Sequence, residues 1–369
     1  VTKKDLSKYQ NSFPLWIDSY NDSGFVVTFS AFDTVDIRAG DMIISINNLS
    51  HTEINNQIAK YSGESKSFAI NNALGLLFPL WIELLEVYAP FNIKYVRNGT
   101  LKTTTIEGIS AINYNKIYEK YIHYNPEPFT FSILENNIGY IEFNSFSYPK
   151  EFKRFLKKTF AQIKKNGCNG LIIDLRNNGG GMADLDDMLL DYINENPYIK
   201  IFAKDSKISQ YHKDFQILVA QKYKDKGFSL EGRKRYLEAP NNTLFSERDT
   251  TEIIPGKNKL RYSGPVCFLI GPKCFSNAKS FIELLENQKI CTLIGEPLEA
   301  IPDEYADLCF FVLPKTKFKF STSTAHFLPL TENYNTPAKP DILIKQKDID
   351  SKQNLDSALE FSKKWILEQ

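Results

Sequence analysis

Apolar and polar positions alternate along much of the first hundred residues, as they do in strands that bury one face. Phe13 to Tyr20 and Gly24 to Ala31 are two such runs, joined by the turn-forming residues Asn21 to Gly24. Longer runs with helical spacing follow between later strands. The pattern predicts strands at 13–20, 24–31, 42–48, 92–97 and 101–106, and helices over 53–61 and 68–87.

From Phe129 onward, the pattern changes to strands that alternate with helices. This alternation predicts a layered α/β domain with a largely parallel sheet. We expect strands at 138–143, 170–176, 265–270 and 291–295, and helices over 148–165, 182–194 and 277–287.

These two patterns predict a first domain over residues 1–107, a polar, tyrosine-rich connector over 108–127, and a second domain over 128–369. A polar, charged segment, 206–259, interrupts the second domain's rhythm. It is interpreted as an insertion or lid, and a plain surface excursion is an equally open interpretation.

Composition narrows the function classes. With 45 basic and 44 acidic residues, the chain has a net charge of +1, which gives no reason to expect a nucleic acid or an anionic membrane as partner. The longest apolar run, near 73–87, contains Pro79, Glu83 and Glu86, so no membrane span is predicted. The five cysteines lack metal-type spacing, and neither a metal nor another cofactor is expected.

Three glycines, Gly179 to Gly181, follow the apolar strand that ends in Asp174-Leu175-Arg176. Glycines between a strand and a helix let backbone N–H groups approach a ligand, and the helix N-terminus adds a positive dipole end. A developing oxyanion or a phosphate would suit this turn, and a turn without any ligand is the alternative. Because neither G-x-G-x-x-G nor G-K-[ST] is present, nucleotide binding is disfavoured.

A second strand, ending at Ile270, leads through Gly271-Pro272 to Ser276 at the start of a helix. Ser276 is either a helix N-cap or a nucleophile placed beside helix N–H groups. A proline-rich loop, 328–341, carries the carboxylate of Glu332, which is either a site residue or an exposed loop acid.

Taken together, these segments resemble the tail-specific (carboxyl-terminal processing) protease family, and its tricorn-like branch in particular. Matching runs also occur at Ile294-Gly295-Glu296 and near the C-terminus, and Ile37 to Asn47 looks like the core of a PDZ-like module. The resemblance implies a crotonase-like second domain, preceded by a PDZ-like domain that binds extended polypeptide. It implies Ser276 as nucleophile, backbone N–H groups of Gly180 and Asn277 as oxyanion hole, and Glu332 as the residue that orients the base.

The general base is where the chain departs from this family. One branch uses a lysine after the Ile-Gly-Glu run, but Leu298 to Ile301 occupy that place. The tricorn-like branch uses a histidine that would fall upstream of Val1, and a start at Val1 suggests a removed signal peptide or a missing leading segment. His51, His123, His212 and His326 match no motif, although His326 is close in sequence to Glu332. Lys279 lies three residues after Ser276, as in S-x-x-K hydrolases.

Several functions therefore stay open at this stage. The favoured one is a serine endopeptidase acting by acyl-enzyme chemistry, with its base upstream of residue 1. The others are a peptide-binding pseudo-peptidase, a Ser-Lys hydrolase that uses Lys279, and thioester chemistry or small-molecule carriage on the same fold. The resemblance implies polypeptide substrates and an exported protein of the cell envelope or periplasm. Neither the oligomeric state nor the cleavage specificity follows from the sequence.

Overall fold

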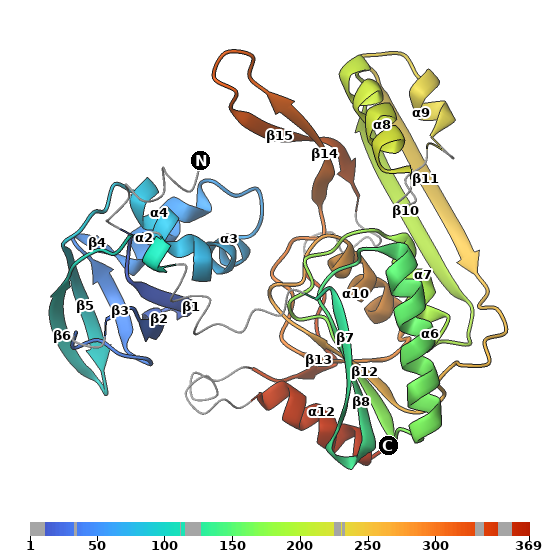
Figure 1. Ribbon diagram of the computed structural model, residues 1–369, viewed down its shortest axis with the longest axis horizontal. Helices are drawn as coiled ribbons and strands as arrows, with labels where there is room; N and C mark the ends of the chain where they lie inside the picture. Colours follow the sequence, from blue (N-terminus) through green and yellow to red (C-terminus); the bar gives the residue numbers. More distant parts are fainter. Residues whose placement is uncertain are drawn as a thin grey trace. The chain divides into compact units, whose positions relative to one another are not determined.

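The computed structural model describes residues 12–32, 35–110, 112–114, 127–224, 230, 233–328, 336–345 and 356–369. The chain divides into two compact units (Figure 1): residues 1–127 with 345–357, and residues 128–344 with 358–369. Among the described residues no single helix is long and apolar enough to cross a membrane, although one bent helix pair passes on length and composition alone.

The first unit is built on an antiparallel sheet with strand order β1-β2-β3-β5-β6, and β4 pairs with β3. Its helices contribute Ile54, Ile70 and Phe78 to one apolar core with the sheet. The elements are β1 (Leu15–Asn21), β2 (Gly24–Ser30), β3 (Met42–Ile46), β4 (Leu49–Ser50), α2 (His51–Ala59), α3 (Lys66–Ala73), η1 (Gly75–Leu77), α4 (Phe78–Leu84), β5 (Phe91–Arg97) and β6 (Thr100–Ile106).

The single helix predicted over 68–87 is wrong, because the chain breaks between α3 and α4. Leu74 is extended, Gly75 has a positive φ of 63°, and Pro79 lies in the first turn of α4. Glycine tolerates this backbone conformation, and proline suits a helix start. The two helices consequently meet at an angle of 106°.

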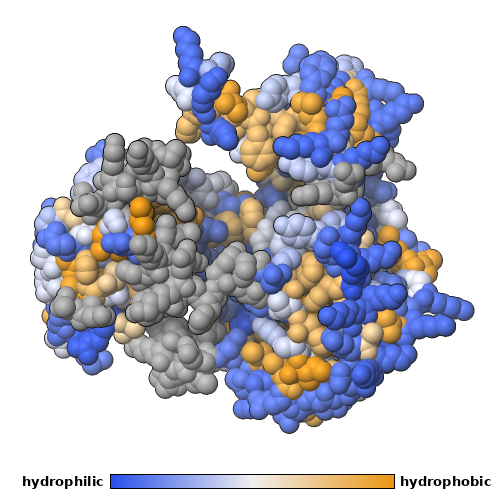
Figure 2. All heavy atoms as spheres, viewed as in Figure 1, coloured by the Kyte–Doolittle hydropathy of each residue, from blue (hydrophilic) through white to orange (hydrophobic). Residues whose placement is uncertain are grey.

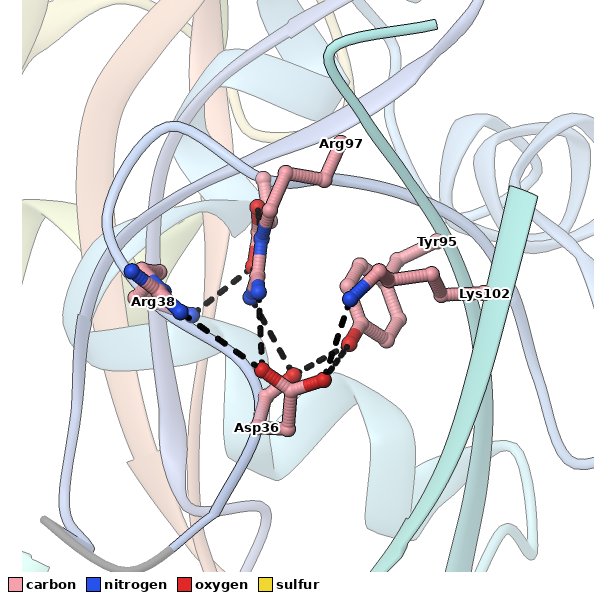
Figure 3. Close-up of polar contacts among 6 residues, drawn as sticks. Asp36, Arg38, Tyr95, Arg97 and Lys102 are labelled. Atoms are coloured by element: carbon pink, nitrogen blue, oxygen red, sulfur yellow. Dashed lines mark hydrogen bonds and ion pairs between the residues drawn. The ribbon is translucent and has the colours of Figure 1, made fainter. Parts of the chain in front are cut away.

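A charged cluster fixes the turn between β2 and β3 (Figure 3). Arg97 on β5 donates to both carboxylate oxygens of Asp41 at 2.7 and 2.6 Å, and to Asp36 Oδ1 at 2.7 Å. Lys102 on β6 donates to Asp36 Oδ2 at 3.3 Å, and the Tyr95 hydroxyl donates to the Asp36 carbonyl. The cluster thereby ties the turn to two strands more than fifty residues away in the sequence.

The second unit contains a six-stranded sheet of order β16-β13-β12-β9-β8-β7. β7 is antiparallel to β8, and the remaining neighbours are parallel. The strands are β7 (Phe129–Leu134), β8 (Ile138–Phe143), β9 (Gly170–Asp174), β12 (Val266–Ile270), β13 (Thr292–Gly295) and β16 (Ile342–Leu343). A mixed α/β fold with a largely parallel sheet is thus confirmed.

Helices cover both faces of this sheet. Apolar side chains of α6 (Pro149–Asn166), α7 (Asp184–Leu190) and α10 (Asn277–Gln288) pack on one face, and those of α12 (Ser357–Leu367) on the other. In α6, Phe152, Leu156, Phe160 and Ile163 recur at helical spacing and are buried, while hydrophilic side chains lie over its outer surface (Figure 2). Pro149 begins the helix and Gly167, with φ of 61°, ends it.

A four-stranded antiparallel sheet of order β11-β10-β15-β14 belongs to the same unit. It combines the segment 206–259 with a hairpin that the sequence did not predict. Its elements are β10 (Tyr198–Lys207), α8 (Gln210–Lys222), α9 (Lys234–Glu238), β11 (Leu244–Ile253), β14 (Glu304–Val312) and β15 (Lys319–Phe327). Most of the 206–259 segment described here is therefore regular structure. A lid role for it stays a prediction.

Candidate active site

The glycine turn and the serine turn lie side by side because they follow neighbouring parallel strands. β9 and β12 pair in parallel from Leu171 with Val266 to Asp174 with Leu269. Carboxyl ends of such strands meet at one edge of the sheet, where ligands of α/β folds commonly bind. The Phe275 N–H donates to the Asn178 carbonyl at 3.1 Å, which holds the two turns together.

Ser276 has a backbone conformation that few non-glycine residues adopt, with φ of 53° and ψ of −128°. It occupies the N-cap position of α10, yet its side chain makes no capping hydrogen bond. The interpretation of Ser276 as an ordinary N-cap therefore fails. Ser276 is instead a half-buried residue with a strained backbone conformation at a strand-to-helix turn.

Gly180 packs directly against this serine. A Cβ atom on Gly180 would lie 2.7 Å from both the Phe275 carbonyl oxygen and Ser276 Cβ, and 2.9 Å from the Asn277 nitrogen. Its φ of 97° also favours glycine. The structure thus brings together three of the residues singled out from the sequence: Ser276, Gly180 and Asn277.

The two predicted oxyanion donors differ in their hydrogen bonding. Asn277 is the first residue of α10, and within the described part of the chain its backbone N–H has no partner. The Gly180 N–H instead donates to Asn178 Oδ1 at 2.8 Å. Asn178 is fully buried and its side chain also donates to the Phe143 carbonyl.

A buried carboxyl group, Asp186 in the first turn of α7, lies behind the serine turn. The Asn277 side chain donates to Asp186 Oδ1 at 2.8 Å. Burial raises the pKa of Asp186 to about 8, against the opposing effects of the Lys200 charge and the Asn277 hydrogen bond. Sequence reasoning missed Asp186 because an acidic residue in a first helical turn normally indicates nothing beyond a favourable dipole interaction.

Lys279 lies on α10 but is committed elsewhere. Its ammonium group donates to the carbonyls of Ile301 and Pro302 at 3.0 and 2.9 Å and pairs with Glu304 at 3.1 Å. The side chain is 2 % exposed, so Lys279 is not a solvated helix lysine. With three donors engaged, its nitrogen is not available to take a proton from Ser276 in this conformation.

The histidines and the predicted orienting acid, Glu332, are distributed over the chain. Glu332 and His123 lie outside the described residues. His212 is buried and forms hydrogen bonds with Tyr236 and Gln216, and its burial lowers its pKa. His326 pairs with the Asp303 carboxylate and stacks on Tyr305. Among the residues that the structure describes, no cluster of three His, Cys, Asp or Glu side chains could hold a metal ion.

Comparison with solved structures supports the fold. Mature CPAF complexed with lactacystin has a TM-score of 0.60 and 14% sequence identity, over 98% of this chain and 84% of that chain. Mature CPAF has a TM-score of 0.59 and 14% identity, over 97% and 81%. The photosystem II D1 C-terminal processing protease has 14% identity over 91% and 72%, but its TM-score of 0.40 is too low to support an argument.

Comparison with curated proteins gives no match. A family model, peptidase family S41, matches residues 137–300, the segment that contains both the glycine turn and Ser276. The part of the chain that contains the candidate site therefore matches peptidase family S41, a family of serine peptidases and hence of hydrolases.

Proposed function

We propose that this protein is a serine endopeptidase that cleaves extended polypeptides, with Ser276 as nucleophile. The observation that carries the proposal is the strained conformation of Ser276. In the described residues its hydroxyl group makes no hydrogen bond, and the backbone N–H of the next residue, Asn277, has no partner either. Its oxygen would attack the scissile carbonyl carbon, and the amine would leave with the serine proton, relayed by a base. Water would then hydrolyse the acyl-enzyme ester.

The oxyanion would form beside the N-terminus of α10. The Asn277 N–H is available there, and the helix dipole favours negative charge. For Gly180 to be the second donor, its N–H must share or exchange its hydrogen bond to Asn178 Oδ1 when substrate binds. Substrate binding would thus complete the oxyanion hole.

A histidine upstream of residue 1, oriented by Glu332, would be the general base. The resemblance to the tricorn-like branch supports this assignment, and the three bonds of Lys279 disfavour the Ser-Lys alternative. Proton transfer from a serine needs such a base within hydrogen-bond reach.

The first unit would act as a PDZ-like module, and the second unit would be crotonase-like. Strand β6 ends the first unit's antiparallel sheet, so among the described residues no strand pairs with its outer side. An extended polypeptide can add to such an edge through main-chain hydrogen bonds. From the family resemblance we further propose a signal peptide and a place in the cell envelope or periplasm.

Labelling with a fluorophosphonate probe, measured by intact mass, tests the nucleophile. We expect an adduct on the wild-type protein that Ser276→Ala abolishes. An equal adduct on Ser276→Ala would refute the assignment. If the present chain gives none, the assay is repeated on any longer form that the gene encodes.

Absence of labelling in that longer form, together with retained peptide binding, would favour the pseudo-peptidase. An adduct on the present chain alone would mean that it contains its own base. His326, which already has a carboxylate partner in Asp303, would then be replaced first.

A further inference from the structure

The second unit contains a side chain that its proposed chemistry does not yet use. Asp186 is 3 % exposed, and in the described residues no cation donates a hydrogen bond to it, which is unusual for a buried carboxyl group. The Lys200 ammonium is 3.9 Å away but lies closer to Asp187, at 3.0 Å, and also donates to the Ala183 carbonyl. The nearest polar partner of Asp186 is therefore the Asn277 side chain, at 2.8 Å.

The position of this hydrogen bond connects both halves of the candidate site. Asn277 directly follows Ser276, and α7, which carries Asp186, begins three residues after Gly181. One bond therefore joins the helix after the glycine turn to the helix after the serine turn. The two residues are 91 positions apart in the sequence.

We propose that Asp186 is a positioning residue for the reaction: by holding the Asn277 side chain, it fixes the Asn277 backbone N–H and Ser276 against the glycine turn. This inference rests on the proposed function. A buried hydrogen bond is costly to leave unmade, and its loss would leave the Asn277 side chain with the longer bond to the Met182 carbonyl, at 3.5 Å, so the first turn of α10 would be held less firmly. Small displacements of oxyanion donors carry large costs in rate.

The charge state of Asp186 adds a second consequence. Three charged groups act on Asp186: Lys200 on β10, and Asp184 and Asp187 on α7 itself. The Asn277 side chain faces Asp186 from α10. If Asp186 loses its proton as the pH rises through the range set by its burial, a negative charge develops next to Asn277. That charge disfavours a developing oxyanion on the other side of the same residue.

The test compares Asp186→Asn, Asp186→Ala and the control Asp187→Asn in the form of the protein that the probe labels. Asp187 lies next to Asp186 on α7 and accepts hydrogen bonds from Tyr198 and Lys200 of β10. No contact joins Asp187 to Asn277 in the described residues. We expect the second-order acylation rate to fall about tenfold or more in Asp186→Ala, and to stay within about threefold in Asp186→Asn and Asp187→Asn.

The pH profile supplies a readout that a purely structural role would not change. The wild-type rate should decline as pH rises through Asp186 ionisation, and this decline should be missing in Asp186→Asn. An unchanged rate in Asp186→Ala, or an equal loss in Asp187→Asn, would overturn the inference.

A measurement without activity separates this inference from the proposed function. If wild-type protein forms no Ser276 adduct in any form, the proposed function fails, and the backbone amide resonance of Asn277 is recorded with ¹⁵N-asparagine labelling. The positioning inference requires that this resonance moves in Asp186→Ala and keeps its place in Asp187→Asn. A resonance that Asp186→Ala leaves in place would refute the positioning role on its own.

Discussion

Asp36 in the first unit and Asp186 in the second are both hydrogen-bonded aspartates, but their surroundings act in opposite directions. Asp36 is exposed, and hydrogen bonds from Arg97 and Lys102 hold its pKa well below the usual range (Figure 3). Asp186 is buried, receives an amide hydrogen bond, and has its pKa raised to about 8. The first environment favours the charged carboxylate, and the second favours the neutral acid.

The comparison teaches that a hydrogen bond alone does not decide the charge of an aspartate. Two cations that donate directly to Asp36 outweigh its modest desolvation. Around Asp186 burial outweighs one amide donor and a more distant ammonium. Ion pairs thus hold the turn in the first unit, whereas beside the serine turn a buried hydrogen bond involves a carboxyl group whose pKa is raised to about 8.

The largest effect is expected where the glycine turn packs against the serine turn, because a side chain at Gly180 would collide with it. Gly180→Ala places a Cβ 2.7 Å from the Phe275 carbonyl oxygen at a φ of 97°, so we expect a loss of at least about 3 kcal/mol in unfolding free energy and loss of probe labelling. Gly179→Ala is the matched control, because a Cβ there meets nothing within 4 Å. Urea denaturation measures both, and equal stability of the two variants would contradict the packing described.

The next effect concerns the pH dependence of the second unit. Because the folded state holds the Asp186 proton up to about pH 8, while an unfolded aspartate loses it near 3.8, the stabilising contribution is complete at low pH and lost as pH rises. The unfolding free energy of wild type, relative to Asp186→Asn, should fall by up to about 1.4 kcal/mol per pH unit across that window. A difference that stays constant with pH would show that Asp186 does not titrate there.

In the first unit the unfolding free energy should depend on pH with the opposite sign. The lowered pKa of Asp36 contributes stability above its unfolded value of 3.8, and this contribution is lost as pH falls. The Asp36→Asn variant should therefore lose less stability than wild type as the pH falls. Thermal unfolding at decreasing pH measures this loss for both proteins. An acid response identical to that of wild type would argue against the ion-pair cluster.

A smaller and graded effect should distinguish the two cations of that cluster. Arg97→Met leaves the buried Asp41 carboxylate, 2 % exposed, without its two-point partner and should lower the thermal midpoint clearly. Lys102→Met removes one exposed pair at 3.3 Å and should change the midpoint little, and less still at high salt. Differential scanning calorimetry measures both midpoints. A larger drop in Lys102→Met than in Arg97→Met would contradict this prediction.

Local pattern was sufficient wherever a structure depends on neighbouring residues. The strand predicted at 138–143 is β8, and the helix predicted from 277 is α10, one residue longer than expected. The meeting of Gly180 and Ser276 was also foreseeable, because both follow parallel strands. The prediction was wrong for 68–87, where Gly75 and Pro79 break the helix, and it missed β14 and β15, whose register depends on pairing with each other and with distant β10.

The alternation of strands and helices, the glycine turn and the serine at a helix start could all be predicted, since they depend on periodicity and on the backbone preferences of single residues. Three properties of the site could not be predicted in this way: the Ser276 hydroxyl makes no capping bond, Lys279 bonds Ile301, Pro302 and Glu304, and Asp186 accepts a hydrogen bond from Asn277. These properties arise from burial and from contacts between segments up to 91 residues apart, and local sequence does not encode such distances.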